Sequence, residues 1–222
     1  MMSVRMTLNQ RYYGGAAAII LAMLAATVVA YPQLPAMVPL HWNAHGLVNG
    51  WGPKWLLFLF GPGSMSALVL LFSALPWLSP KKFEVDSFRA TYLYMMIVTI
   101  TMLAYVEMLV LIWGLGMKFA MGSAVEGGVC LFLALLGNVM GKVRRNFYLG
   151  IRTPWTLANE RVWNATHRMA AKTFFVGGLL GLISVIAQAP FWTPLTFIVA
   201  AALVPGVYSL AVYKQLERRG EI

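Results

Sequence analysis

The chain has 222 residues, of which 60% are hydrophobic and only 11% are charged, and its mean hydropathy is +0.72. Soluble domains are about half apolar and roughly a quarter charged, so this composition excludes an ordinary soluble domain and indicates a membrane protein. The net charge of +10 would suggest nucleic-acid binding in a soluble protein. Here we attribute it to membrane topology and expect no direct contact with nucleic acid. The single cysteine, Cys130, lies in an apolar run, which excludes a disulfide framework and a cysteine-based metal site.

Six apolar stretches predict six membrane-spanning helices within one polytopic membrane domain that covers residues 1–222. Each stretch is close to the ~20 residues that a helix needs to cross ~30 Å of hydrocarbon. We therefore predict an all-α integral membrane protein, a bundle of six transmembrane helices. The spans are expected at about residues 15–31, 55–78, 91–115, 119–140, 171–189 and 193–213.

The distribution of Lys and Arg predicts the orientation of the spans, because these residues collect in cytoplasmic loops. If the N-terminus is inside, all but two of the 17 Lys and Arg residues fall on the inner side, and the exceptions are Lys54 and Lys118. We therefore predict a multi-pass protein of the bacterial cytoplasmic membrane with both termini in the cytoplasm. The loop at 32–54 is then outside, and the loop at 141–170 is cytoplasmic.

The loop at 32–54 is rich in proline, which favours extended backbone at its own position and at the preceding residue. The segment "LPAMVPLHW" therefore predicts a strand, and "NAHG" predicts a turn in which Gly46 takes a positive φ. Asn49 and Gly50 give a second turn signal. We expect a strand–turn–strand unit that holds Trp42 and Trp51 at the membrane interface.

Glycine and proline predict how the spans bend and pack. Pro62 in "GPGS" removes a backbone donor and predicts a kink in the second span. Small residues four apart favour close helix contacts in membranes, although composition alone also produces such pairs. The last two spans are separated only by "PFW" and must form an antiparallel hairpin. The candidate pairs are Gly137 with Gly141 and Gly177 with Gly181.

Two carboxylates, Glu107 and Glu126, fall inside predicted spans, where an ionisable group costs several kcal/mol unless it is paired, neutral or hydrated. Both are expected at a similar depth in the outer leaflet, on adjacent helices, on the side that carries His41 and His45. Three interpretations remain open. Each carboxyl is neutral and hydrogen-bonded by itself, or the two share a polar cavity, or they bind a divalent metal together with the two histidines. No other cofactor is expected.

The loop at 141–170 predicts a helix that begins with Thr153 as cap and Pro154 in the first turn. This helix is expected to run to about residue 169 and to lie flat at the inner interface. Its cations would meet anionic lipid, or the helix would dock a cytoplasmic partner. Its apolar face is expected to carry Trp155, Ala158, Val162, Ala165 and Met169.

Two blocks of the sequence resemble the SdpI family of bacterial membrane proteins. The block in the outer loop matches the family at Leu34, Pro35, Val38, Pro39, His41, Trp42, Asn43, Gly46, Gly50 and Lys54. His45 departs from the pattern, since family members more usually have a small or polar residue there. The cytoplasmic block matches at Asn138, Asn146, Gly150, Ile151, Arg152, Thr153, Pro154, Trp155, Thr156, Leu157, Trp163, Thr166, His167 and Arg168.

The resemblance implies a membrane immunity or signalling protein. Family members are known for resistance to a secreted peptide toxin and for sequestering a transcriptional repressor on the cytoplasmic side. The resemblance thus implies a ligand outside, a regulator inside and the lipid bilayer as surroundings, and the oligomeric state is left open. The expected outer ligand-binding residues are His41, Trp42, Asn43, His45, Gly46, Glu107 and Glu126. The expected cytoplasmic partner surface comprises Asn146, Arg152, Thr153, Trp155, Trp163, His167 and Arg168.

Two other function classes remain as alternatives, although we assign no catalytic residue and favour a protein that is not an enzyme. A metal-dependent membrane hydrolase would use His41, His45, Glu107 and Glu126. The spacing of the two histidines lacks the adjacent glutamate that acts as general base in HExxH sites. A small-solute or proton-coupled transporter would use the broken second span and the intramembrane carboxylates.

Overall fold

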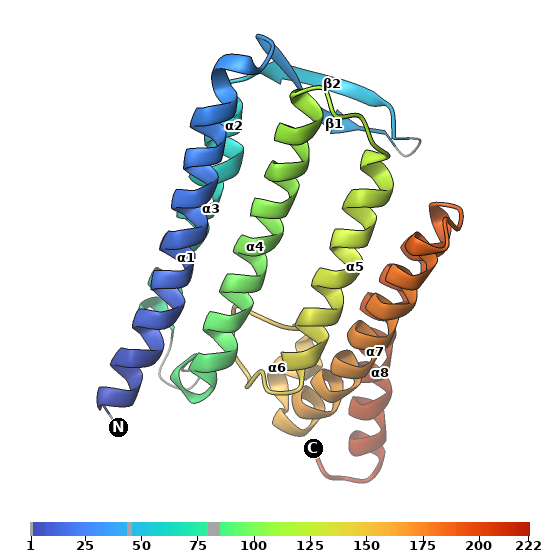
Figure 1. Cartoon of the computed structure of the whole chain (residues 1–222). Helices are drawn as coiled ribbons and strands as arrows, with labels where there is room; N and C mark the ends of the chain where they lie inside the picture. The colour runs from blue at the N-terminus through green and yellow to red at the C-terminus, as the bar shows by residue number, and fades with distance from the viewer. Residues whose placement is uncertain (1, 44–45, 80–84) are drawn as a thin grey trace. The chain divides into compact units, whose positions relative to one another are not determined.

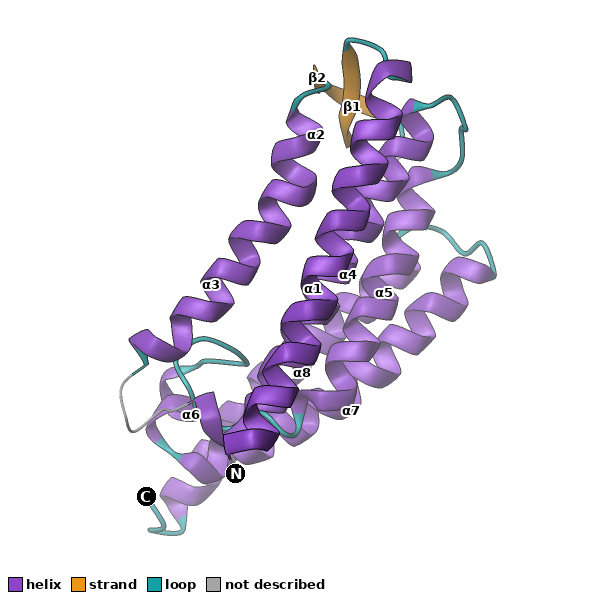
Figure 2. Cartoon of the chain, turned by 60° about the vertical axis from the view of Figure 1, so that its left-hand side comes forward, coloured by secondary structure: helices purple, strands orange, loops and turns teal. Residues whose placement is uncertain are grey.

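The structure, a computed structural model, describes residues 2–43, 46–79 and 85–222. Within these residues, six helical segments are long and apolar enough to cross a membrane, and the only sheet has two strands (Figure 2). The prediction of an all-α membrane protein with six spans is therefore confirmed. The candidate spans are Thr7–Gln33, Leu56–Leu78, Val85–Gly114, Met121–Met140, Glu160–Ile186 and Trp192–Arg218.

The chain forms two compact units. Unit 1 comprises Met1–Ser73 and Leu93–Gly128, and unit 2 comprises Ala74–Tyr92 and Val129–Ile222. The boundaries between the units fall inside three helices, so each of these helices contributes residues to both units.

Unit 1 contains the N-terminal helix, the hairpin and the broken second span (Figure 1). Helix α1 ends in a 3₁₀ turn, η1, and the chain then enters the antiparallel strands β1 and β2. The unit also holds most of α4 and the first part of α5. The bounds are α1 Met2–Ala30, η1 Tyr31–Gln33, β1 Met37–Trp42, β2 Val48–Pro53, α2 Leu56–Phe58, η2 Leu59–Gly63, α3 Ser64–Leu78, α4 Arg89–Gly114 and α5 Met121–Met140.

The second span is kinked at the predicted place. Segment η2 is a π-turn in which Gly61 has the non-helical angles φ −82° and ψ −106°. Pro62 has no N–H to donate, so the Phe58 carbonyl four residues earlier loses its usual helical partner. Ser64 Oγ donates to the Gly61 carbonyl at 3.0 Å, and Ser66 Oγ donates to the Pro62 carbonyl at 2.8 Å. Serine hydroxyls therefore add hydrogen bonds to the carbonyls at the kink.

Unit 2 contains the last two spans and the loop that precedes them. A 3₁₀ turn, η4 (Val85–Phe88), leads into α4, and after α5 come α6 (Pro154–Ala158), α7 (Glu160–Ile186) and α8 (Trp192–Arg218). Helices α7 and α8 pack side by side along their length. Gly177 lies against Phe197 and Ala201, and Gly181 lies near Pro194. The predicted antiparallel hairpin is confirmed.

Glycines bring the backbones of α5 and α7 into contact. A Cβ atom on Gly178 would lie 2.5 Å from the Cys130 carbonyl oxygen, and one on Gly137 would lie 2.4 Å from the Phe175 nitrogen. No side chain fits at such distances, so glycine allows the close packing that drives helix association in lipid. Among the predicted small residues, Gly141 is at ordinary contact distance from α7. The close approach of Gly178 was not predicted.

The predicted helix over 153–169 differs from the structure. Helix α6 ends at Ala158, and Asn159 is extended, with φ −132° and ψ 127°. The Asn159 side chain accepts hydrogen bonds from the Arg161 and Val162 nitrogens and so caps a new helix, α7, which continues to Ile186. Residues 160–169 therefore extend the fifth span. The sequence did not predict this break between two helices. An asparagine within a helical pattern of apolar residues is consistent either with the polar face of one helix or with the N-cap of a new one.

We expect Gly178→Ala to destabilise the protein, since overpacking a tight contact costs typically about 1–3 kcal/mol. The measurement is the thermal unfolding temperature of the purified protein in detergent. Gly206→Ala in α8 is the matched control, because a Cβ there meets nothing within 4 Å and alanine favours a helix over glycine. Equal unfolding temperatures for the two variants would contradict the glycine-mediated contact.

Candidate functional site

The predicted site residues fall into two groups, one on the hairpin and two helices of unit 1 and one in the loop and α7 of unit 2. The hairpin has the predicted strand–turn–strand form. Its strands pair with Pro39 opposite Trp51 and His41 opposite Gly50, and the register shifts on both sides of His41. These irregularities give the strand around His41 a local bend.

Asn43 closes the hairpin turn. Its backbone N–H donates to the Leu47 carbonyl at 2.9 Å, and its side-chain oxygen accepts from the Leu47 nitrogen at 3.0 Å. Its carbonyl accepts from Gly46, which has a φ of +74°. Glycine adopts this left-handed conformation without the steric cost of a Cβ. The main role of Asn43 and Gly46 is therefore to shape the turn.

Lys54 fastens the base of the hairpin to the end of the first span. Its ammonium donates to the carbonyls of Tyr31 at 2.8 Å and Leu34 at 3.1 Å, and it lies 4.4 Å from the centroid of the Tyr31 ring. The carbonyls at a helix C-terminus carry partial negative charge, so a cation is favourable there. Its backbone N–H also donates to the Ala36 carbonyl. Lys54 thus fixes the strands relative to α1.

Trp42 supports the other end of the hairpin. Its ring meets Trp113 of α4 edge to face, with the centroids 5.9 Å apart, a favourable geometry for aromatic pairs. The Lys118 ammonium lies over the Trp113 ring and donates to its carbonyl at 3.0 Å. Leu34 packs against Gly114 in the same region. The hairpin therefore lies on the end of α4.

The exposed side of the hairpin presents apolar side chains and one polar pair. We call this surface the hairpin face. His41 Nδ1 and Asn49 Oδ1 lie 2.5 Å apart, so the imidazole is paired with an amide. The apolar members have between 49% and 65% of their surface exposed. They are Met37, Leu47, Trp51 and Trp55. An exposed apolar patch on a rigid support indicates a surface for a protein, a peptide or the membrane.

The structure places Glu107 away from the hairpin face. Its side chain is only 5% exposed and lies over Gly61 in the kink, where a Cβ would be 2.7 Å from the carboxyl carbon. One carboxyl oxygen has no hydrogen-bond partner among the described residues. From Trp113, which the hairpin contacts, Glu107 is about 9 Å farther along the helix.

Glu107 and Glu126 do not face each other. Tyr105 donates a hydrogen bond to the Ala124 carbonyl at 2.8 Å and fills the space beside Gly128, so it marks the contact between α4 and α5. Residues two apart on a helix point to nearly opposite sides. Both carboxylates are two residues from this contact and therefore point away from it. The two carboxyl groups are at similar levels on adjacent helices, but they do not share the predicted polar cavity.

The predicted metal ligands are not gathered into one site. His41 pairs with Asn49, Glu107 lies against the kink, and His45 lies outside the described residues. In the part of the chain that the structure describes, no group of three or more His, Cys, Asp or Glu residues is placed to hold a metal ion.

In unit 2, Asn146 organises the loop after α5. It is fully buried, and its side-chain oxygen accepts from the nitrogens of Tyr148 and Leu149, both at 2.7 Å. Its amide group donates to the carbonyls of Arg144 at 2.8 Å and Leu149 at 3.0 Å. One side chain thus replaces the backbone pairing that an irregular segment lacks.

His167 attaches the same loop to α7. Its Nε2 accepts from the Ile151 N–H at 3.1 Å, so Nδ1 carries the proton that it donates to the Trp163 carbonyl at 2.9 Å. Its ring stacks on that of Trp163, with the centroids 4.1 Å apart. Gly150 has a φ of +106°, and a Cβ there would lie 2.2 Å from Nε2. Glycine is therefore required at position 150 for two separate reasons.

The short helix α6 is held at both ends. Thr153 caps it in a reciprocal capping box with Thr156, which satisfies free donors of the first turn. Trp155 Nε1 donates to Ser209 Oγ of α8 at 2.5 Å. The Arg145 guanidinium donates to the carbonyls of Leu157 and Ala158 at 3.2 and 3.3 Å. Helix α6 is thus tied to α8 and to the loop that follows α5.

The predicted partner surface therefore separates into buried and exposed members. Asn146, Trp163 and His167 have no exposed surface and cannot contact a partner directly. Thr153 and Trp155 are partly buried by the contacts of α6, whereas Arg152 and Arg168 are exposed. The sequence pattern could not separate the two groups, because buried polar residues and surface residues alternate along the same block.

We expect Asn146→Leu to loosen this loop, because the Tyr148 and Leu149 nitrogens would lose their acceptor at a cost of about 1–3 kcal/mol for an unsatisfied buried group. Faster trypsin cleavage between residues 144 and 152 and a lower unfolding temperature would report the change. Asn164→Leu in α7 is the control, since that amide has no hydrogen-bond partner among the described residues. A loop equally resistant in both variants would show that Asn146 does not organise it.

Comparison with known proteins identifies two regions of similarity. A family model described as the SdpI/YfhL protein family matches residues 142–210, which include the loop held by Asn146 and His167. A second model, a domain of unknown function (DUF1648), matches residues 18–65, which include the hairpin. No solved structure matches the chain.

One curated relative extends the similarity over most of the chain. The immunity protein SdpI of Bacillus subtilis (strain 168) is 28% identical over 191 residues, which cover 84% of this chain and 87% of the relative. The match includes both the hairpin and the block at 138–168 that the residue patterns single out. The chain has the six candidate spans of a multi-pass membrane protein and is similar to the SdpI/YfhL family in both regions.

Proposed function

We propose that this protein confers immunity by binding a secreted peptide on the hairpin face. The observation that carries the proposal is an exposed apolar surface on a hairpin fixed from both ends. Lys54 holds the strands to the first span, and the Trp42–Trp113 contact holds them to α4. The relative named as an immunity protein supports the same class of function.

The chemistry of the hairpin face suits an apolar or amphipathic peptide. Trp51 and Met37 provide large exposed apolar area, and tryptophan is the residue type that most often dominates binding energy at interfaces. His41 and Asn49 place polar atoms beside them. Both strands are edge strands of a two-stranded sheet, and each contains one proline that cannot donate. An extended peptide would add along an outer edge of this sheet.

We expect expression of the wild-type protein to protect a sensitive bacterium against one or more secreted antimicrobial peptides, and Trp51→Ala to reduce that protection. The measurement is survival across a panel of peptides at matched protein levels. Trp77→Ala is the control, because Trp77 is 86% exposed but lies on α3 rather than on the hairpin. Unchanged killing by every peptide would remove the immunity function, and equal protection by both variants would remove the hairpin face as the binding surface.

We also propose that the hairpin is outside the cell and both termini are in the cytoplasm. The asymmetric placement of Lys and Arg supports this orientation. It would direct the exposed Arg152 toward the cytoplasm, where we propose that it contacts a regulator. Buried Asn146 and His167 would then hold that surface in shape and have no direct contact with the regulator.

Cysteine labelling tests this orientation. In a Cys130→Ala background, Leu47→Cys on the hairpin should react with a membrane-impermeant maleimide in intact cells, because Leu47 is 65% exposed. Gln215→Cys, near the end of α8, should react only after the membrane is opened. The reverse pattern, with position 215 labelled in intact cells and position 47 protected, would show the opposite orientation.

A further inference from the structure

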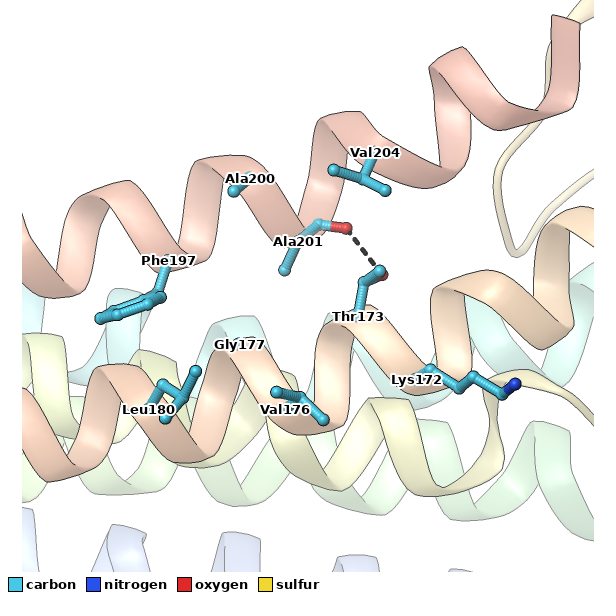
Figure 3. A pocket seen from close by; sticks show the side chains of 9 residues that line it. All are labelled: Lys172, Thr173, Val176, Gly177, Leu180, Phe197, Ala200, Ala201 and Val204. Carbon is cyan, nitrogen blue, oxygen red and sulfur yellow. Dashed lines mark hydrogen bonds between the residues drawn. The ribbon is translucent and has the colours of Figure 1, made fainter. Parts of the chain in front are cut away.

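An apolar groove runs between α7 and α8 in unit 2 (Figure 3). Its volume is about 320 Å³, and its walls are formed mainly by aliphatic and aromatic side chains. Val176 and Leu180 line it from α7, and Phe197 and Val204 line it from α8. Val176, Leu180 and Val204 are each more than 40% exposed, so the groove is open to its surroundings.

Small residues create the groove and leave no free polar group at its base. A Cβ on Gly177 would lie 2.8 Å from Ala201 Cβ, so a larger residue there would alter the helix contact. The hydroxyl of Thr173 donates to the Ala201 carbonyl at 3.0 Å (Figure 3). Because this hydroxyl is already paired, the groove offers a ligand almost only apolar contacts and suits an alkyl chain.

The groove is expected to face the acyl chains of the membrane. The sequence contains no charged residue from Thr173 to Tyr213. Lys172 is therefore the last charge before the apolar part of the fifth span, and about 17 residues of helix and turn, roughly 26 Å, separate it from Ala189. That length is close to the thickness of the hydrocarbon core, which places Lys172 near one membrane surface.

A positively charged side chain lies at one end of the groove. Lys172 lines it, and its ammonium has no ion-pair or hydrogen-bond partner among the described residues. Arg168 is exposed one turn earlier on the same helix, so two cations share one face. Lysine extends its apolar stem along an apolar surface and keeps its ammonium near the interface. An anion at that position would complement both charges.

We propose that this groove binds one acyl chain of an anionic phospholipid, with the lipid phosphate held by Lys172 and Arg168. The apolar walls account for the chain, and the two unmatched cations account for the headgroup. This site lies in unit 2 and does not depend on peptide binding at the hairpin face.

Native mass spectrometry of the full-length protein in detergent tests the proposal. Titration with phosphatidylglycerol should give a bound lipid at lower concentration than titration with phosphatidylcholine of the same chains. Lys172→Gln should reduce this preference at least several-fold. Lys214→Gln is the control, since Lys214 is also exposed but pairs with Glu217 on α8. Equal binding of the two lipids, or a preference unchanged in Lys172→Gln, would overturn the proposal.

Two further measurements separate the chain from the headgroup. Glycerol phosphate, which has the charge but no acyl chain, should not compete with the lipid. Val176→Trp should weaken binding of both lipids by filling the groove, and it changes an exposed side chain, so folding should be retained. Full competition by glycerol phosphate, or undiminished lipid binding in a folded Val176→Trp variant, would show that the groove does not hold the chain.

Discussion

The need to pair every backbone polar group without help from water is the constraint on which this structure depends. An unpaired N–H or C=O costs free energy wherever it is shielded, and the hydrocarbon core allows almost no exception. Regular helices meet the requirement by themselves. The protein departs from them at the kink around Gly61, at the end of α1 and in the loop after α5. In each place side chains supply further hydrogen bonds to the backbone: Ser64 and Ser66, Lys54, and Asn146.

This explains why the residues that carry the family resemblance are mostly structural. Asn43 shapes the hairpin turn, and Lys54 attaches the hairpin to the first span. Asn146 and His167 hold the loop of unit 2 around a buried tryptophan. These residues make two rigid supports at which other side chains are displayed. Contact with ligands would then fall to residues outside these patterns, such as Trp51 on the hairpin, so the family pattern by itself does not identify the ligand.

Irregular segments and the surfaces proposed for binding coincide in this chain. An unanchored hairpin would lose conformational entropy when it bound a ligand, and this loss would weaken binding. Anchoring the hairpin in the free protein reduces that cost. The same reasoning applies to unit 2, where α6 is fixed to α8 through Trp155 and Ser209. Exposed Arg152, which directly precedes the cap of α6, is thereby held on a defined support. Glu107 has a different setting, since within unit 1 it lies against the kink and away from the hairpin.

The sequence by itself determined the class of protein, the six spans, the kink at Pro62, the hairpin and the resemblance to a family, because hydropathy, proline and turn residues act locally along the chain. Only the tertiary structure decided which polar residues are buried. Asn146 and Arg152 are six residues apart in one loop, yet one has no exposed surface and the other is exposed. It also decided that Glu107 and Glu126 point apart and that Asn159 begins a new helix. Such outcomes depend on which neighbouring element supplies a partner or occupies the space, and that information is not contained in the spacing of residues along one segment.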